Sequence, residues 1–453
     1  MLVERLPLQA VAADSAHAAA AAAGGVGWGG SVGGWGVRVG GHMGTLTRSA
    51  ARESAARGPL GEDALRALAS YEHRSEMEGW LDRIVMTPLW EAAAARVPPF
   101  VHPNTVTAAG NLFTLLAGVL AVVYCPGVDC AAAEAAGALP PWVLLAIPAA
   151  FFAYQTLDAV DGKHARALGC GSPVGCLWDH GCDAFTWPHF FVATFSMASL
   201  GAGVRLALSL AVRPLATYVA YWEARHCGPL RWPVGTTESQ FLAMAIGVVG
   251  FVCGASLFVA SLPLPGPLLG VLPQPIASAA RTVVVADVVC LAGLAGPLRN
   301  AIEGVRRVSC SNQRHEGAAR ELGAMVVLLW SVAVMHLSPF GQEHPLELLA
   351  LLTLSFSHQC NKVIVKDVCK LPADAWEPGV VALVPLAFSA AWGSLWTLPA
   401  ARALAIALLV AWARFGGGAL RQILGAVGMR MWSPPEACVE RLIRAHRERV
   451  KRA

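Results

Sequence analysis

Ten apolar segments follow one another along this 453-residue chain, and they limit what it can fold into. They occupy residues 105–124, 142–157, 184–200, 204–222, 241–262, 282–298, 324–337, 348–365, 380–392 and 403–412. Only 14% of the residues are charged, whereas soluble domains average about 25%. We therefore expect an all-α, polytopic integral membrane protein with about ten transmembrane helices. Several segments are shorter than the roughly 20 residues of a full span, so their flanks must contribute or they tilt little.

Lysine and arginine are distributed unevenly between the connecting loops. The loops at 125–141 and 263–280 contain neither residue, whereas residues 299–320 carry five arginines and the C-terminus is strongly basic. Ten helices threaded with the N-terminus in the cytosol place every strongly basic loop on the cytosolic side, and only Arg402 falls on the other side. This topology puts residues 158–183, between the second and third spans, at the cytosolic face.

The regions before the first span differ in character. Residues 1–58 are rich in alanine and glycine without apolar periodicity, which predicts a disordered extension; a transit or signal peptide is the weaker alternative. Between residues 76 and 91, apolar residues recur at helical spacing, which predicts an amphipathic helix on the membrane surface, although a helix packed on its own protein fits nearly as well. The predicted regions are 1–58 (extension), 59–100 (cytosolic and interfacial), 101–225 (catalytic helices), 226–415 (remaining spans) and 416–453 (basic cytosolic tail).

Four carboxylates stand close together in the sequence at the ends of the second and third apolar segments. Asp158 and Asp161 are three residues apart, and Asp179 and Asp183 are four apart, so each pair shares one face of a helix. Because charge is costly in apolar surroundings, such a group needs a compensating cation. The oxygen-rich set predicts a site for two divalent ions, Mg²⁺ or Mn²⁺.

Other residues of this segment have properties suited to phosphate chemistry. Gly162 and Gly175 leave room for close approach of a helix or a substrate, and Arg166 offers a planar fork of donors. His180 can be neutral near pH 7 and could accept a proton. A helix cap or a salt-bridge network would explain one or two of the acids, but not four at two helical spacings together with these residues.

The complete pattern is D-x-x-D-G-x-x-A-R-x₈-G-x₃-D-x₃-D, and it resembles the signature of the CDP-alcohol phosphotransferases. The flanking Ser172-Pro173 and the stretch from His102 to Thr107 are similar to the choline/ethanolamine phosphotransferase branch. Tyr221-Trp222-Glu223 and residues 236–240 resemble later loops of that branch more faintly. The ten predicted spans also fit this branch better than relatives with about six.

The resemblance implies that the chain transfers phosphocholine or phosphoethanolamine from CDP-choline or CDP-ethanolamine to diacylglycerol, releasing CMP. The residues matching its metal ligands are Asp158, Asp161, Asp179 and Asp183, and those matching its substrate-binding positions are Asn104, Arg166, Gly162 and Gly175. His180 matches the proposed general base, with Asp183 as the rival. The family also implies an endoplasmic reticulum or Golgi membrane, and a homodimer is compatible with it.

One position departs from that branch, because Cys176 stands where it usually has a glutamate beside the second glycine. The missing glutamate is thought to help hold the nucleotide, so the departure concerns the cytidine contacts and donor selectivity. The metal-binding aspartates are unaffected.

Two other functions fit part of the sequence. A phosphatidyltransferase that uses CDP-diacylglycerol would share the aspartate motif, and a cation-coupled transporter would use intramembrane acids but place them near mid-span. A net charge of +4 gives no electrostatic basis for nucleic-acid binding.

The twelve cysteines predict no disulfide framework; Cys125 and Cys130 share a loop, but we expect them to stay unpaired. The cysteines near His180 lack the spacing of a zinc site.

Overall fold

The computed structural model describes residues 53–56, 58–68, 79–231, 235–262, 283–311, 317–373, 377–434 and 439–440, together with the backbone of the short strands at 35–36 and 74–76. Nearly all of the predicted disordered extension therefore lies outside the described residues.

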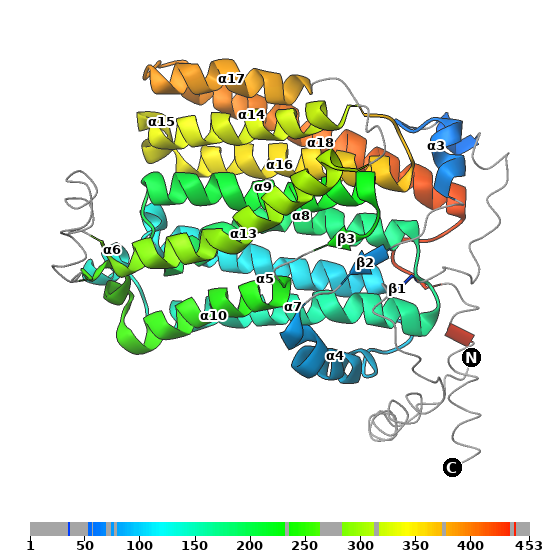
Figure 1. Cartoon of the computed structure of the whole chain (residues 1–453), viewed down its shortest axis with the longest axis horizontal. Helices are drawn as coiled ribbons and strands as arrows, with labels where there is room; N and C mark the ends of the chain where they lie inside the picture. The colour runs from blue at the N-terminus through cyan, green and yellow to red at the C-terminus, as the bar shows by residue number, and fades with distance from the viewer. Residues whose placement is uncertain are drawn as a thin grey trace, which may run out of the picture.

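Long helices dominate the structure and run back and forth along one common axis (Figure 1). Each of the ten apolar segments overlaps one long helix of the described chain. These helices are α5 (Pro103–Tyr124), α7 (Val143–Leu168), α8 (Pro173–Met197), α9 (Val204–Cys227), α10 (Thr236–Cys253), α13 (Val285–Ser309), α14 (Ala318–Leu337), α16 (Pro345–Val368), α17 (Pro378–Ala391) and α18 (Thr397–Val427). The predicted boundary of the tail at residue 416 falls inside α18.

By length and composition, seven of the described helices could cross a membrane: α5, α7, α10, α13, α14, α16 and α18. Of the other three long helices, α17 has only 14 residues. α8 carries aspartates and histidines, and α9 carries arginines and a glutamate, which lower their apolar character. The prediction of an all-α, multi-pass membrane protein is confirmed.

Several shorter elements connect or flank the long helices. They are α3 (Glu62–Ala67), η2 (Asp82–Met86), α4 (Thr87–Ala94), η3 (Pro126–Val128), α6 (Cys130–Ala135), η4 (Ala255–Val259) and α15 (Pro339–Glu343). A small sheet joins β1 (Trp35–Gly36) antiparallel to β2 (Arg74–Glu76), which pairs parallel with β3 (Leu230–Arg231). In its register Ser75 lies opposite Leu230.

The expected amphipathic helix at 76–91 corresponds to η2 and α4, a π-helical turn followed by an α-helix. On the inner side, Met86 and Trp90 are buried against Val160 of α7. On the outer side, Ile84 and Leu89 are exposed. The segment therefore has one apolar face packed on the protein and a second one uncovered by the described residues, and its location at the membrane surface stays a prediction.

The loop after α5 contradicts one expectation. Cys125 and Cys130 form a disulfide, although we expected them to stay unpaired. A glycine with positive φ at Gly127 reverses the chain between them, and this turn brings the two thiols together.

A tight turn between α7 and α8 places the motif. α7 ends at Gly169, whose φ of 65° is the left-handed conformation that glycine adopts readily. α8 begins after Ser172, whose side chain accepts a hydrogen bond from the Gly175 N–H, and Pro173 occupies the first helical turn. The turn directs the two helices back along each other, so the ends that carry the aspartates meet. We call this end of the bundle the motif end.

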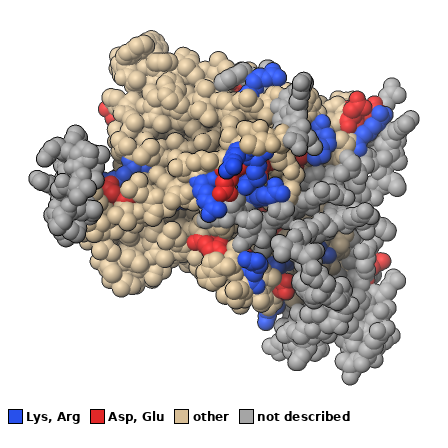
Figure 2. Space-filling model, in the orientation of Figure 1, with Lys and Arg blue, Asp and Glu red and all other residues tan. Residues whose placement is uncertain are grey.

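Charged side chains form two clusters of ion pairs at the motif end, each around a buried glutamate. Glu223 of α9 is paired with Arg307 of α13 at 2.9 Å and with Arg231 of β3. Glu321 of α14 contacts Arg225 on α9 and also His226 and Lys366. Charged residues gather in Figure 2 over the region where α9 and α13 end, whereas most of the surface over the helices is free of them. These ion pairs connect helices that are distant in the sequence.

Candidate active site

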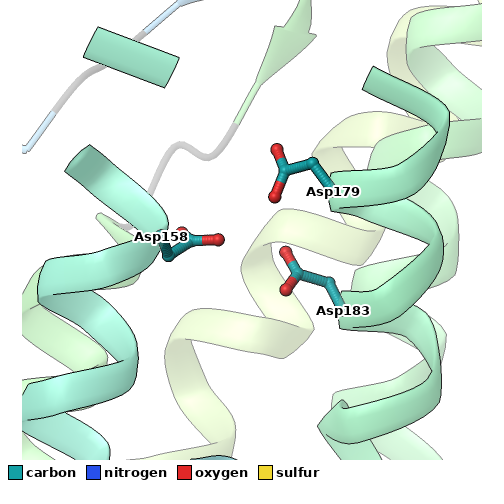
Figure 3. Close-up of side chains that lie close together, drawn as sticks. All are labelled: Asp158, Asp179 and Asp183. Carbon is teal, nitrogen blue, oxygen red and sulfur yellow. The ribbon is translucent and has the colours of Figure 1, made fainter. Parts of the chain in front are cut away.

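Three of the four motif aspartates converge between α7 and α8 (Figure 3). Asp158 projects from α7 toward Asp179 and Asp183, which lie one turn apart on α8. One carboxylate oxygen from each lies within 4.8 Å of the others. The helical spacing read from the sequence thus places carboxylates from two helices around one small volume.

The fourth aspartate has a different partner. Asp161 is buried, and one of its oxygens accepts a hydrogen bond from the Thr107 hydroxyl of α5. It is not among the three residues whose oxygens converge. Asp161 therefore links the cluster on α7 to the helix that packs against both α7 and α8.

Two polar residues that the sequence analysis did not single out hold Asp183. The Tyr154 hydroxyl donates a hydrogen bond of 2.8 Å to Asp183 Oδ1 from one turn before Asp158 on α7. The Asn111 side chain of α5 also interacts with Asp183 and accepts a bond of 2.6 Å from Thr186. The four-residue spacing from Tyr154 to Asp158 was a signal, because it puts both on one face of α7.

The cluster fits divalent metal ions. Its converging ligand atoms are all carboxylate oxygens, the donors that hard cations prefer. Within the described chain, the buried Asp179 Oδ1 has no hydrogen-bond partner. Buried polar atoms are normally satisfied, so this free oxygen suits coordination to a cation.

The predicted substrate-binding residues lie at the two sides of the cluster. The guanidinium of Arg166 lies over Gly162, with Nη1 only 3.4 Å from where a Cβ there would be. On the α8 side, a Cβ at Gly175 would lie 3.9 Å from Asn104 Oδ1. The Asn104 amide donates to the backbone oxygen of Met431, just beyond α18. The glycines thus leave space next to Arg166 and Asn104.

His180 stands beside the cluster on α8. Its Nε2 lies 3.7 Å from Asp179 Oδ2, and its Nδ1 lies 3.5 Å from the sulfur of Cys176. The ring also packs against Tyr221 of α9, with centroids 5.4 Å apart. Both Cys176 and Tyr221, which the sequence analysis noted for other reasons, therefore contact this imidazole.

The residue that precedes α5 contacts one of the predicted substrate-binding residues. His102 caps α5, and its Nδ1 accepts a hydrogen bond from the Asn104 N–H. Burial, and next the neighbouring His164, lowers the pKa of His102 to about 4, so the ring is neutral at pH 7. Burial likewise raises the pKa of Asp82 in η2, although a hydrogen bond with Thr237 acts in the opposite direction.

A bundle of apolar helices that presents an aspartate cluster at one end defines a multi-pass membrane protein with a candidate metal centre. The profile of the CDP-alcohol phosphatidyltransferase family matches residues 100–290, which include α5, α7 and α8. Over this region the chain resembles the CDP-alcohol phosphotransferase family, and the similar relatives carry names from its choline/ethanolamine phosphotransferase branch.

Several characterised relatives are similar to this chain. Cholinephosphotransferase 1 of Xenopus laevis is 30% identical over 47% of this chain and 53% of its own length. Choline/ethanolaminephosphotransferase 1 of Arabidopsis thaliana is 28% identical over 70% of this chain and 80% of its own. Cholinephosphotransferase 1 of Gallus gallus is 32% identical over 46% of this chain and 60% of its own length. The chain thus spans little more than half the length of the frog and chicken relatives that it matches.

Proposed function

We propose that this protein transfers phosphocholine or phosphoethanolamine from the matching CDP-alcohol to diacylglycerol, making phosphatidylcholine or phosphatidylethanolamine and CMP. The observation that carries the proposal is the convergence of Asp158, Asp179 and Asp183 from two facing helices in a chain that resembles this family. The names of the relatives support the choice of donor and acceptor.

The carboxylates would hold the metal ions of the reaction. Asp158, Asp179 and Asp183, with Asp161 beside them, would bind two Mg²⁺ or Mn²⁺ ions. Bound there, such ions supply electrostatic stabilisation of the pyrophosphate and of the attacking and leaving oxygens. The hydrogen bonds from Tyr154 and Thr107 would orient the carboxylates to which they are donated.

The remaining residues would position the donor and move one proton. Arg166 would contact the phosphates through its planar fork, while Gly162 and Gly175 leave the space for them. The diacylglycerol oxygen attacks the phosphorus of the phospho-alcohol, and the bond from that phosphorus to the CMP oxygen breaks. His180 would take the proton that the hydroxyl releases. Cys176 contacts this histidine and stands where the choline/ethanolamine phosphotransferase branch usually has a glutamate. We therefore expect the preference between donors to differ from the preference of the members of that branch.

The proposed location is an endoplasmic reticulum or Golgi membrane with the motif end in the cytosol. Soluble CDP-alcohols would reach the site there, while the acceptor comes from the bilayer. The basic residues near the ends of α13 and α18 support this orientation.

The test is an assay of the purified full chain in mixed micelles. Diacylglycerol and Mn²⁺ or Mg²⁺ would be supplied with labelled CDP-choline or CDP-ethanolamine, and CMP release would be measured. We expect turnover with at least one donor, and its disappearance in Asp183→Asn. CMP release only from CDP-diacylglycerol, with a soluble alcohol such as inositol or glycerol phosphate supplied as the acceptor, would instead favour a phosphatidyltransferase of the same family. No release from any donor would refute the proposal.

A further inference from the structure

A second feature of the described chain is a cavity behind the aspartate cluster. It has a volume of about 440 Å³ and lies between α5, α8, α16 and α18. Its wall is mostly apolar and includes Leu115, Phe185 and Leu420. The polar residues in the wall are few, and Asn111 and Asn361 are two of them. A cavity of this size and character is suited to an apolar ligand.

Small residues on α18 create part of this space. Gly416 and Gly417 both line the cavity, and a Cβ added at either would meet no atom within 4 Å. Their helix lies beyond residues 100–290, the part matched by the family profile. The cavity is therefore built jointly by the motif helices and by helices outside that match.

The cavity adjoins the bilayer-facing side of the bundle. Leu112, which lines it, is 65% exposed, and Leu116 and Val119 continue an exposed apolar surface along α5. α5 is also one of the helices that could cross a membrane. The part of a membrane-crossing helix that carries these residues is surrounded by hydrocarbon. The molecules that can enter the cavity from the bilayer are therefore lipid chains.

The cavity is separated from the space between the carboxylates. On α8, Gly181 and Phe185 line the cavity, whereas Asp179 and Asp183 point the other way, toward Asp158 on α7. Asn111 stands between the two, because it lines the cavity and also interacts with Asp183. A hydroxyl seated in the cavity would therefore have α5 and α8 between it and the carboxylates.

We propose that this cavity is a site for one acyl chain of a bilayer phospholipid, which binds as a resident lipid rather than as the acceptor of the reaction. The apolar wall and the contact with the bilayer-facing surface define the chemistry of the ligand. The position on the far side of α8 excludes direct participation in the reaction. A chain bound there packs against Asn111 and so helps to hold Asp183 in place.

Photolabelling tests the proposal. The full chain is placed in nanodiscs containing phosphatidylserine with a diazirine on one acyl chain, a lipid that the proposed reaction neither uses nor makes. After irradiation, labelled peptides are mapped by mass spectrometry. We expect label in the parts of α5 and α18 that line the cavity, and loss of that label when Gly416→Leu and Gly417→Leu are combined to fill it.

Two further variants make the result specific. Ala411→Leu changes an exposed residue of α18 outside the cavity and should keep the label. Leu112→Trp narrows the mouth at an exposed position, so it should reduce labelling even if the double glycine variant fails to fold, as judged by size-exclusion elution.

Three results would overturn the proposal. One is the absence of label from the lining of the cavity in the wild-type chain, and another is undiminished label in folded variants with the cavity filled. The third is removal of the label by excess diacylglycerol, because the cavity would then belong to the acceptor. None of these outcomes depends on turnover, so they are independent of the assay of the proposed function.

Discussion

At the scale of single residues, Tyr154 gives the clearest test of the proposed metal centre. Its hydroxyl donates to Asp183 and its side chain is buried, so the Tyr154→Phe variant removes one hydrogen bond and little packing. We expect the Mn²⁺ concentration for half-maximal activity to rise by about tenfold, because partners of ligating carboxylates tune metal affinity. Turnover at saturating Mn²⁺ should change little.

A matched control is available for this measurement. Tyr218 is also buried, but its hydroxyl donates to the backbone oxygen of Glu321, away from the cluster. Tyr218→Phe should leave the metal dependence unchanged. Equal shifts in the two variants would mean that Tyr154 acts through general stability and not through Asp183.

His180 allows a separate test of the proton transfer. If it is the general base, His180→Ala should lower kcat by roughly 10²- to 10⁴-fold, while the Mn²⁺ dependence stays near that of the wild type. The measurement is steady-state CMP release at several metal concentrations. Near-normal turnover would remove the base assignment and leave the similarity to the family unaffected.

Spacing predicted that the carboxylates of each pair share a helix face, because residues three or four apart lie on one side of a helix, but it also grouped Asp161 with the other three. Asp158, Asp179 and Asp183 meet as the pattern indicated. The partner of Asp161 could not be predicted, since Thr107 lies 54 positions earlier and the contact depends on how α5 packs. Asn111 was missed for the same reason.

At the scale of elements, the start of α5 carries a pH-dependent contribution to stability. The pKa of His102 falls from its ordinary 6.5 to about 4 in the folded protein, mainly through burial. The unfolded chain therefore binds a proton between these values that the folded chain does not, and stability decreases as pH falls. The contribution is complete above pH 6.5 and is lost progressively toward pH 4.

Thermal unfolding in detergent between pH 7 and pH 5 measures this effect. His102→Asn keeps a side-chain oxygen able to cap the helix but cannot be protonated, so its melting temperature should fall less steeply with decreasing pH. His102→Ala also loses the cap, at about 0.5–2 kcal/mol, and should melt lower at every pH. An unchanged slope in His102→Asn would contradict the proposed titration.

Apolar length predicted where the long helices would be, even for α8 and α9, whose charged residues keep them out of the seven most apolar helices. The helical spacing at 76–91 indicated an amphipathic helix, and the structure adds a π-helical turn at Asp82–Met86. That turn depends on tertiary partners such as Glu238, which accepts a hydrogen bond from the Leu81 N–H. The spacing of apolar residues within a short segment cannot predict a contact with a residue so distant in the sequence.

At the scale of the whole molecule, features formed by distant segments were the least predictable. The cavity needs Gly416 and Gly417 of α18 opposite α5, about 300 positions away, and no local signal joins them. The ion pair between Glu223 and Arg307 likewise depends on the packing of α9 against α13. The disulfide was missed because five-residue spacing permits a bond only when a turn such as that at Gly127 closes the loop.

The disulfide and the charge distribution together predict the orientation of the molecule. Cys125 and Cys130 are paired at the end opposite the motif, whereas the unpaired Cys310 is exposed where α13 ends, at the motif end. If the motif end is cytosolic, a membrane-impermeant maleimide added to sealed, cytosol-out microsomes should label Cys310. Cys125 and Cys130 should react only after both permeabilisation and reduction, because the lumen is oxidising. Labelling of Cys310 only after permeabilisation would reverse the orientation and place the aspartate cluster on the side away from soluble CDP-alcohols.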